Sequence, residues 1–452
     1  MDRIWTKHKK INPVRSKTPL ASADALAHRT SNGVNTTLKP KVFVGMSGGV
    51  DSSVAAALLK QEGYAVVGVH LKCWNVDGCA EEDAEDARRA AETLNIPFYV
   101  LDFEREYKAA VVNYMVEGYR RGLTPNPDVM CNREIKFGLF LKKAREMGAD
   151  YIATGHYVRI RDANKARMHT NDANSPTTLP ANNSRHSHGF ALRSRRLFIA
   201  KDVNKDQSYF LWTLTQGQLK YCLFPIGEYT KPQVRALARR FGLPNAEKKD
   251  SQGICFLGKV TLADFLGRYI PERRGEILDV RGEKIGEHRG AQFYTIGQRH
   301  IGVANRGFTR TGRGTTRTEN MKPYYVAEKN MRTNTLVVAE GGDHPVLYRK
   351  EVFLRDVHFI SATYSNVLKN IRIGGMKVYA RVRYRQPLAP ATLIYADRTQ
   401  TAADMKIFPR ESVPFSASIR VLFEVPQKAV APGQSTVFYS RRGELVGGGV
   451  IC

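Results

Sequence analysis

Short apolar runs alternate with amphipathic segments between Lys41 and Val158, and this alternation constrains the fold more than any other feature of the chain. The apolar runs have the length and composition of buried strands, which predicts strands at residues 41–46, 65–71, 97–102 and 150–158. The segments between them have helical periodicity, which predicts helices from about residue 50, then over 81–95, 106–122 and around 137–144. Repeated strand–helix units imply an α/β fold with a mostly parallel sheet and helices on both faces.

Individual residues indicate where these helices begin, pack and end. Gly63 is the expected stop of the first helix. Further along, Thr230 and Gln233 have the spacing of a capping box, and Pro232 is well tolerated in that first turn. The buried stripe of the helix around 137–144 consists of Phe137, Phe140, Leu141 and Ala144.

After about residue 260 the pattern changes to short β-like runs with glycine-rich turns, and the last hundred residues predict a small antiparallel barrel or sandwich. Alternation in "KVYARVRYR" predicts a strand that shows a basic comb to solvent, made of Lys377, Arg381, Arg383 and Arg385. Alternation in "SIRVLFEV" predicts four inward side chains, Ile419, Val421, Phe423 and Val425. In contrast, the polar, non-periodic residues 162–196 predict a flexible insertion.

Charge and cysteine usage narrow the class of protein. Lys plus Arg number 70 against 43 Asp plus Glu, a net charge of +27, which favours a polyanionic partner such as nucleic acid. The 6 cysteines include no C-x-x-C pair and form no disulfide framework, so we expect a reducing compartment. No apolar run reaches membrane-spanning length. The basic residues 1–40 lack a secretory signal's apolar core, and we interpret them as a disordered leader of a cytoplasmic protein. The alternative is a mitochondrial transit peptide, although these residues form no convincing amphipathic face.

The stretch "GMSGGVDSS" follows the first predicted strand and opens the first helix. Gly48 and Gly49 let backbone amides approach a ligand, Ser47 and Ser52 supply hydroxyls, and the helix N-terminus favours an anion. The stretch is neither a Walker loop nor G-x-G-x-x-G. Its S-G-G-x-D-S pattern resembles the pyrophosphate loop of the ATP pyrophosphatase superfamily, which implies that ATP is cleaved between its α and β phosphates.

Two cysteines stand in polar, turn-rich contexts. Cys131 follows "TPNPDVM" at an expected helix start, where a thiol tends to ionise, and Cys255 lies in "DSQGICFLG". Two such thiols could exchange sulfur, one as a persulfide and the other resolving it as a disulfide. Asp128 could act as acid or base at the same site, and the alternative for Asp128 is an ordinary helix-capping aspartate.

Together, "GMSGGVDSS", "TPNPDVMCNREIKF", "ATGHY", "KDQSYFLW", "DSQGICFLG", "YTIGQR" and "RYRQ" closely resemble the bacterial tRNA-specific 2-thiouridylase family, in family order. The resemblance implies a Rossmann-like ATP pyrophosphatase domain at 41–258, a small central domain at 259–345 and a tRNA-binding β-barrel at 346–452. It also implies that ATP, with Mg²⁺, adenylates the 2-oxygen of the wobble uridine. Sulfur from a persulfide on Cys255 then replaces that oxygen. Cys131 is the nucleophile, Asp128 the acid/base, and a Cys131–Cys255 disulfide regenerates the site.

The resemblance also implies the binding residues. The ATP contacts fall on Gly45, Met46, Ser47, Gly48, Gly49, Val50, Asp51, Ser52, Leu71 and Gly155. Asn126, Pro127 and Asp128 match the segment that touches the target base. Other tRNA contacts fall on His156, Lys205, Asp206, Gln207, Arg383, Tyr384 and Gln434. The implied sulfur donor is a cysteine desulfurase or a sulfur-relay protein.

Several alternatives stay open at this point. Some relatives carry a cysteine at the position of Asp128, which suggests a labile iron–sulfur cluster in place of the persulfide route. A different ATP pyrophosphatase, such as an amide-forming ligase on a small metabolite, would need neither cysteine. A non-catalytic RNA-binding protein would use the barrel alone. The chain also departs from the family in its leader, in the 162–196 insertion and in a basic glycine/threonine loop near 305–322.

Overall fold

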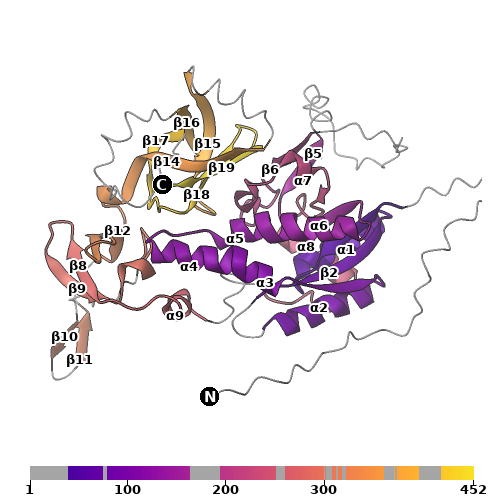
Figure 1. The fold of residues 1–452 in the computed structure, drawn as a ribbon, viewed down its shortest axis with the longest axis horizontal. Coiled ribbons are helices and arrows are strands. Elements are labelled where there is room, and N and C mark those ends of the chain that lie inside the picture. Colours follow the sequence, from indigo (N-terminus) through magenta and orange to yellow (C-terminus); the bar gives the residue numbers. More distant parts are fainter. Residues whose placement is uncertain are drawn as a thin grey trace, which may run out of the picture. The chain divides into compact units, whose positions relative to one another are not determined.

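The computed structural model describes residues 39–74, 79–162, 194–250, 260–299, 301, 308–311, 314–317, 322–360, 371, 374–395 and 419–452 (Figure 1). Nearly all of the predicted leader and of the predicted 162–196 insertion lies outside these residues, and so does Cys255. The ends of the insertion are described: β5 (Arg159–Asp162) and β6 (Arg195–Phe198) pair antiparallel, so the insertion connects two neighbouring strands.

A parallel sheet forms the first half of the described chain. Its strand order is β3-β2-β1-β4-β7, and every neighbouring pair is parallel, which confirms the α/β prediction. The strands are β1 (Lys41–Gly45), β2 (Ala65–Lys72), β3 (Phe98–Asp102), β4 (Tyr151–Thr154) and β7 (Cys222–Leu223). The central strands β1 and β2 are nearly continuous apolar runs because most of their residues are buried on both faces, as in other parallel sheets.

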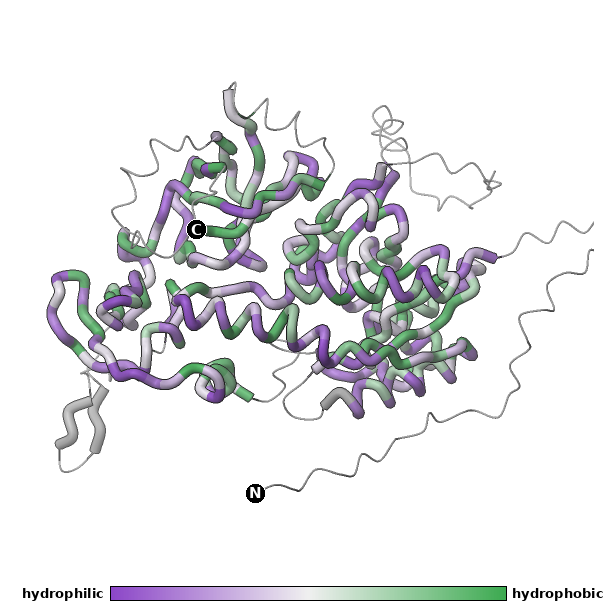
Figure 2. Tube along the Cα trace, in the orientation of Figure 1, coloured by the Kyte–Doolittle hydropathy of each residue, from purple (hydrophilic) through white to green (hydrophobic). Residues whose placement is uncertain are grey.

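Helices cover both faces of this sheet. On one face Val42 and Val44 pack with α1 (Val50–Gln61), α2 (Cys79–Thr93) and α8 (Lys231–Arg240). On the other face Phe43 and Val69 pack with Phe137, Phe140, Leu141 and Ala144, so the predicted stripe is confirmed as core. Figure 2 shows α2 as mainly hydrophilic beside mainly hydrophobic strands. The predicted ends are also confirmed: Gly63 has φ +89°, and Gln233 Oε1 accepts from the Thr230 amide at 2.8 Å.

Two helical segments of this half contain wider, π-helical turns. The first runs through α3 (Glu104–Tyr107), η2 (Lys108–Val112) and α4 (Asn113–Arg120). The second runs without a break through α5 (Pro127–Met130), η3 (Cys131–Leu139) and α6 (Phe140–Glu146). Both η2 and η3 are π-helical, a conformation that is rare and often occurs at functional sites. Short elements complete this half: η5 (Ser208–Leu211) and α7 (Gln216–Leu219).

The central part of the chain begins with α9 (Leu262–Gly267) and forms a sheet of order β12-β13-β8-β9. Its strands are β8 (Gly275–Asp279), β9 (Lys284–His288), β12 (Tyr324–Asn330) and β13 (Thr335–Glu340), with the short helices η6 (Ala291–Phe293) and η7 (Pro345–Leu347). The segment near 305–322 contains a hairpin, β10 (Phe308–Thr311) paired with β11 (Gly314–Arg317). The interpretation of that segment as a loop was therefore incomplete.

The C-terminal part is a closed antiparallel barrel, which confirms the first of the two predicted architectures. Its order is β14 (Tyr348–Phe359), β17 (Ile419–Lys428), β16 (Ala389–Tyr395), β15 (Met376–Arg381), β18 (Ser435–Tyr439) and β19 (Leu445–Ile451). Ile419, Val421 and Phe423 point into the barrel core as predicted. Val425 is 62% exposed, because the pairing of β14 with β17 shifts register beyond Leu422 and breaks the alternation.

The prediction of a basic comb on β15 is wrong, because only Lys377 of its four residues lies exposed on the strand. Arg381 is only 4% exposed, and its guanidinium donates to Asp206 and to the Tyr439 hydroxyl. The strand ends at Arg381, so Arg383 and Arg385 belong to the following turn rather than to the same strand face. Among the described helices, none is long and apolar enough to cross a membrane.

Candidate functional site

The loop between β1 and α1 has the shape of an anion cradle. Gly48 has φ +76°, and a Cβ there would lie 2.3 Å from the Asp83 carbonyl oxygen, so only glycine fits. Gly49 is the N-cap of α1 and makes no side-chain cap, which leaves the amides of the first helical turn available to a ligand. The Ser47 amide donates to Ser52 Oγ at 3.2 Å, which draws the two ends of the loop together.

The other predicted nucleotide contacts lie around this loop, but not all present a side chain. A Cβ on Gly155, just beyond β4, would lie 2.6 Å from the Ser52 amide nitrogen, so this glycine allows the two segments to touch. Leu71 is half-buried near the end of β2. Met46 is 1% exposed, and its carbonyl oxygen accepts from His70 Nδ1 at 3.0 Å. The Met46 amide donates to the Val69 carbonyl oxygen at 2.7 Å, so both polar backbone groups of Met46 already have partners.

Residues that sequence reasoning missed hold the loop in place. Asn245 Nδ2 donates to the Gly48 carbonyl oxygen at 2.9 Å and to Ser53 Oγ at 3.0 Å. Asp51 accepts from the Tyr157 hydroxyl at 2.8 Å and from Lys231 Nζ at 2.8 and 2.9 Å. The capping box had marked the start of α8, but nothing in its spacing indicates that Lys231 reaches back to the loop.

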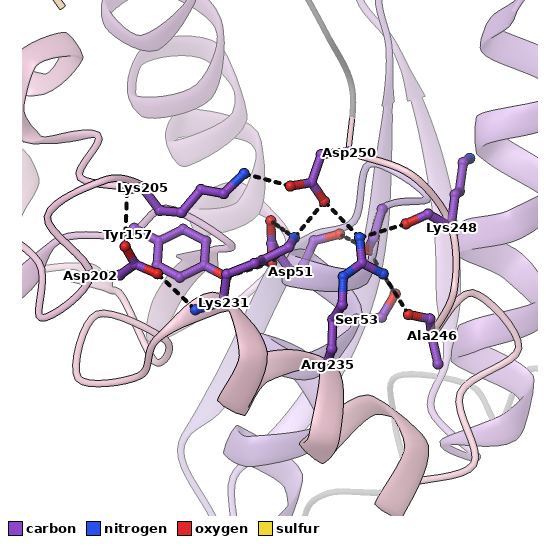
Figure 3. Close-up of polar contacts among 12 residues, drawn as sticks. Asp51, Ser53, Tyr157, Asp202, Lys205, Lys231, Arg235, Ala246, Lys248 and Asp250 are labelled. Atoms are coloured by element: carbon purple, nitrogen blue, oxygen red, sulfur yellow. Dashed lines mark hydrogen bonds and ion pairs between the residues drawn. The ribbon is translucent and has the colours of Figure 1, made fainter. Parts of the chain in front are cut away.

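Lys231 also belongs to a cluster of ion pairs around Asp250 (Figure 3). Asp250 lies 2.7 Å from Lys231 Nζ, 2.5 Å from Lys205 Nζ and 3.1 Å from Arg235 Nη2. Burial acts to raise the pKa of Asp250, but the hydrogen bonds from Lys205 and Lys231 lower that pKa to about 2. Asp250 therefore stays ionised at neutral pH and holds two lysines and an arginine near the glycine loop.

The helix that carries Cys131 begins earlier than predicted. Asn126 is its N-cap and accepts from the Val129 amide at 3.3 Å, and Pro127 is the first helical residue. The Cys131 amide already bonds to the carbonyl oxygens of the preceding turn, so the thiol lies beyond the first turn, where the influence of the helix dipole has fallen off. The prediction of a cysteine at the helix start is therefore wrong in its physical premise. Cys131 is buried, with 7% of its surface exposed.

Asp128 and His156 share the electrostatic environment of Lys136. Asp128 is half-buried and does not cap the helix; burial raises the pKa of its carboxyl, and the Lys136 charge opposes that shift. His156 is 7% exposed, and burial holds the pKa of its imidazole well below the usual value, an effect that the Lys136 charge increases. Its Nδ1 lies 2.8 Å from Thr154 Oγ1. His156 is therefore neutral at pH 7, and Asp128 is better suited to donate a proton than an exposed aspartate.

The predicted tRNA contacts differ in accessibility. The side chain of Lys205 is 29% exposed and paired with Asp250, and Gln207 Oε1 accepts from the Tyr157 amide at 3.0 Å. The Asp206 carboxylate is fully buried and bonds to Arg381 and to Ser208 Oγ. These partners offset the cost of burying an ionised carboxylate. Asp206 therefore links β15 to the α/β half and does not face solvent.

Three further predicted contacts, Tyr384, Arg383 and Gln434, touch the α/β half or the central part of the chain. The ring of Tyr384 packs against Phe210 with centroids 4.5 Å apart and ring planes tilted by 48°, and Arg383 Nη2 donates to the Ile296 carbonyl oxygen at 2.5 Å. Gln434 Nε2 donates to the Thr124 carbonyl oxygen at 2.9 Å. A cavity of about 340 Å³ is lined by Thr124, Thr295, Ile296, Gly297, Gln298, Arg383 and Gln434. The described residues thus bring Arg383 and Gln434 together, whereas Cys255 lies outside them, beyond Asp250.

Comparison with known proteins places this geometry in context. Three family models match consecutive parts of the chain: "tRNA methyl transferase HUP domain" at residues 40–259, "tRNA methyl transferase PRC-barrel domain" at 263–340 and "Aminomethyltransferase beta-barrel domain" at 412–451. The tRNA-specific 2-thiouridylase of Salmonella paratyphi B is 40% identical over 91% of this chain and 96% of its own length. Its counterparts from Salmonella choleraesuis and Shigella flexneri are 41% and 40% identical, with the same coverage.

Proposed function

Because the chain belongs to the tRNA-specific 2-thiouridylase family, we propose that it is a tRNA sulfurtransferase that replaces the 2-oxygen of the wobble uridine by sulfur at the expense of ATP. The single observation that carries this proposal is 40% identity over 91% of the chain, since so long a match includes the loop and both cysteines. The proposed division is a catalytic domain at 41–258, a central domain at 259–345 and a tRNA-binding barrel at 346–452.

The glycine loop would bind the phosphates of ATP. Its uncapped first-turn amides and the crowding at Gly48 fit a phosphate group held against backbone, and Lys231, Lys205 and Arg235 supply positive charge nearby. Mg²⁺ accompanying ATP would neutralise phosphate charge, with Asp51 as the carboxylate of the loop. The uridine 2-oxygen attacks the α-phosphorus, pyrophosphate leaves, and the oxygen becomes part of a good leaving group, AMP.

The sulfur step would use the two cysteines and Asp128. Cys255 carries the persulfide, and the thiolate of Cys131 attacks the Cys255 sulfur, which forms a disulfide and releases the terminal sulfur toward carbon 2 of the base. AMP then leaves, and a cellular thiol reductant restores both thiols. The raised pKa of Asp128 suits it to supply or remove a proton at this centre. A labile iron–sulfur cluster held partly by these cysteines is the competing route.

The target base would be extruded from the anticodon loop, which costs less than extrusion from a duplex. The segment Asn126–Pro127–Asp128, directly before Cys131, is the proposed contact with that base. His156, Lys205, Gln207, Arg383, Tyr384 and Gln434 remain proposed tRNA contacts, and the net charge of +27 suits such a partner. We further propose a cytoplasmic location and a cysteine desulfurase or sulfur-relay protein as the donor.

A thiolation assay tests this function. Unmodified tRNA, ATP, Mg²⁺ and a desulfurase-based sulfur source are incubated with the parent, with Cys131→Ser and with Cys255→Ser, and Cys452→Ser is the control. We expect AMP and 2-thiouridine from the parent and the control, and no turnover from the other two. AMP without modified tRNA would point instead to a ligase acting on another acceptor. Salt-dependent tRNA binding without AMP would point to a non-catalytic binder, and an added methyl group, distinguished by mass, would point to methyl transfer.

A further inference from the structure

The π-helical conformation of η3 changes which residue lies on the same face as Cys131. In an α-helix, residues three and four apart are neighbours, so Lys136, five residues after Cys131, would lie on a different face. In η3 each amide bonds to the carbonyl five residues earlier, as the Phe140 amide does to Ile135. That register places residue i+5 close above residue i. The wide turn therefore rotates Lys136 toward the face of the helix that carries Cys131.

The sequence contains a residue that the wide turn requires. A Cβ on Gly138 would lie 2.8 Å from the carbonyl oxygen of Arg133, five residues earlier, a contact closer than real side chains tolerate. A larger residue at this position would push the turn away from its observed geometry. Gly138 thus keeps the register that rotates Lys136 toward the face of Cys131.

Electrostatics indicate where the Lys136 ammonium points. Its charge acts on Asp128 from the same helix and on His156 from the segment after β4, so the ammonium lies on the side that these residues share. Arg133 and Glu134 form a pair at 2.7 Å on the exposed side of the helix. Tyr114 of α4 lies near Asn126 and feels the charge of Arg133. His156 is neutral, and Cys131 lies too far along the helix for the dipole to act strongly.

We propose that Lys136 is the positioning cation of this reaction centre, which we define as Asp128, Cys131, Lys136 and His156, and that η3 is π-helical in order to bring it there. Its ammonium stabilises the thiolate of Cys131 in a buried position, where an anion would otherwise be costly. The catalytic use of that thiolate rests on the proposed function. The proposed placement of Lys136 and its effect on the Cys131 thiol are independent of the proposed function.

The test follows the reactivity of Cys131 without any substrate. The full-length parent, Lys136→Met and Lys136→Arg are treated with iodoacetamide over a range of pH, and Lys143→Met, on an exposed lysine of α6, is the matched control. Trypsin releases Cys131 in the peptide 122–133, whose sequence none of these substitutions alters, so mass spectrometry gives its alkylation rate alone. Circular dichroism confirms that each variant is folded.

We expect Lys136→Met to slow alkylation at neutral pH by about tenfold, equivalent to one pKa unit, and to shift the rate profile to higher pH. Lys136→Arg should restore most of the rate, because it keeps the charge, and Lys143→Met should match the parent. Superimposable profiles for the parent and a folded Lys136→Met would overturn the proposal, even if the parent makes 2-thiouridine. Conversely, a shifted profile in a parent that leaves tRNA unmodified would support the role of Lys136 and contradict the proposed function.

Discussion

Lys231 Nζ donates to both carboxylate oxygens of Asp51, at 2.8 and 2.9 Å, across 180 residues of sequence. The same ammonium lies 2.7 Å from Asp250, so one lysine stands between two carboxylates beside the glycine loop. Without it, two partly buried negative charges would face the place where we propose that ATP phosphates bind.

The substitution Lys231→Met should therefore impair ATP binding strongly while it lowers the free energy of unfolding only moderately. We expect the KM for ATP to rise about tenfold or more, since like charges would repel the phosphates. The free energy of unfolding should fall by roughly 1–3 kcal/mol, as for other partly buried hydrogen-bonded charges. Initial rates of AMP formation and urea unfolding measure the two effects. Lys142→Met, on an exposed lysine, is the control. An unchanged KM for ATP in Lys231→Met would show that the ion-pair cluster takes no part in ATP binding.

Asp250 should make a pH-dependent contribution to stability. Its pKa falls from 3.8 to about 2 in the folded protein, so its stabilisation is complete above the unfolded pKa and is lost as the pH falls from about 4 toward 2. The shift corresponds to about 2 kcal/mol. Asp250→Asn should thus lower the free energy of unfolding at pH 7. Below pH 4 the free energies of unfolding of the variant and the parent should become more similar. Urea titrations at several pH values check this. A constant difference would show that Asp250 acts through packing rather than through charge.

The pair Asp206–Arg381 should act as a buried structural link. Both side chains are nearly inaccessible, with 0% and 5% exposed, and Arg381 also donates to the Tyr439 hydroxyl at 2.7 Å. Asp206→Asn or Arg381→Met alone should cost about 3–5 kcal/mol, because each leaves an uncompensated buried charge. The double substitution should cost less than the sum of the two. If Asp206→Asn instead weakened tRNA binding with no loss of stability, Asp206 would be an RNA contact after all.

Gly138→Ala should lower the free energy of unfolding, whereas the same substitution in an ordinary helix usually raises it. Alanine normally stabilises a helix interior by up to about 1 kcal/mol relative to glycine. Here the new Cβ would lie 2.8 Å from the Arg133 carbonyl oxygen, so we expect a loss of stability together with slower alkylation of Cys131. Gly267→Ala, at a helical glycine with open space around its Cβ position, is the matched control and should be neutral or stabilising. Stabilisation by Gly138→Ala would argue against the wide turn.

Features with a local physical cause were predictable from the sequence. The pattern was sufficient to identify the parallel sheet, because its doubly covered strands are short apolar runs, and the core stripe around Phe140, because one face of that helix must be buried. Gly63 and Thr230 were correctly assigned, because left-handed backbone and capping depend on a few neighbouring residues. The glycine loop was recognisable for the same reason, since its chemistry lies within one strand–loop–helix unit.

Tertiary structure alone decided the partners that come from distant parts of the chain. Alternation placed Arg381 on a solvent face, but Asp206, 175 residues away, buries it. Capping residues located α8 without showing that Lys231 reaches Asp51. Local spacing put Cys131 at a helix start, whereas in the structure the helix begins at Pro127, after the N-cap Asn126, and becomes π-helical from Cys131. The sequence by itself determined which segments form strands, helices and turns, while long-range packing, which no local pattern encodes, decided which charges meet.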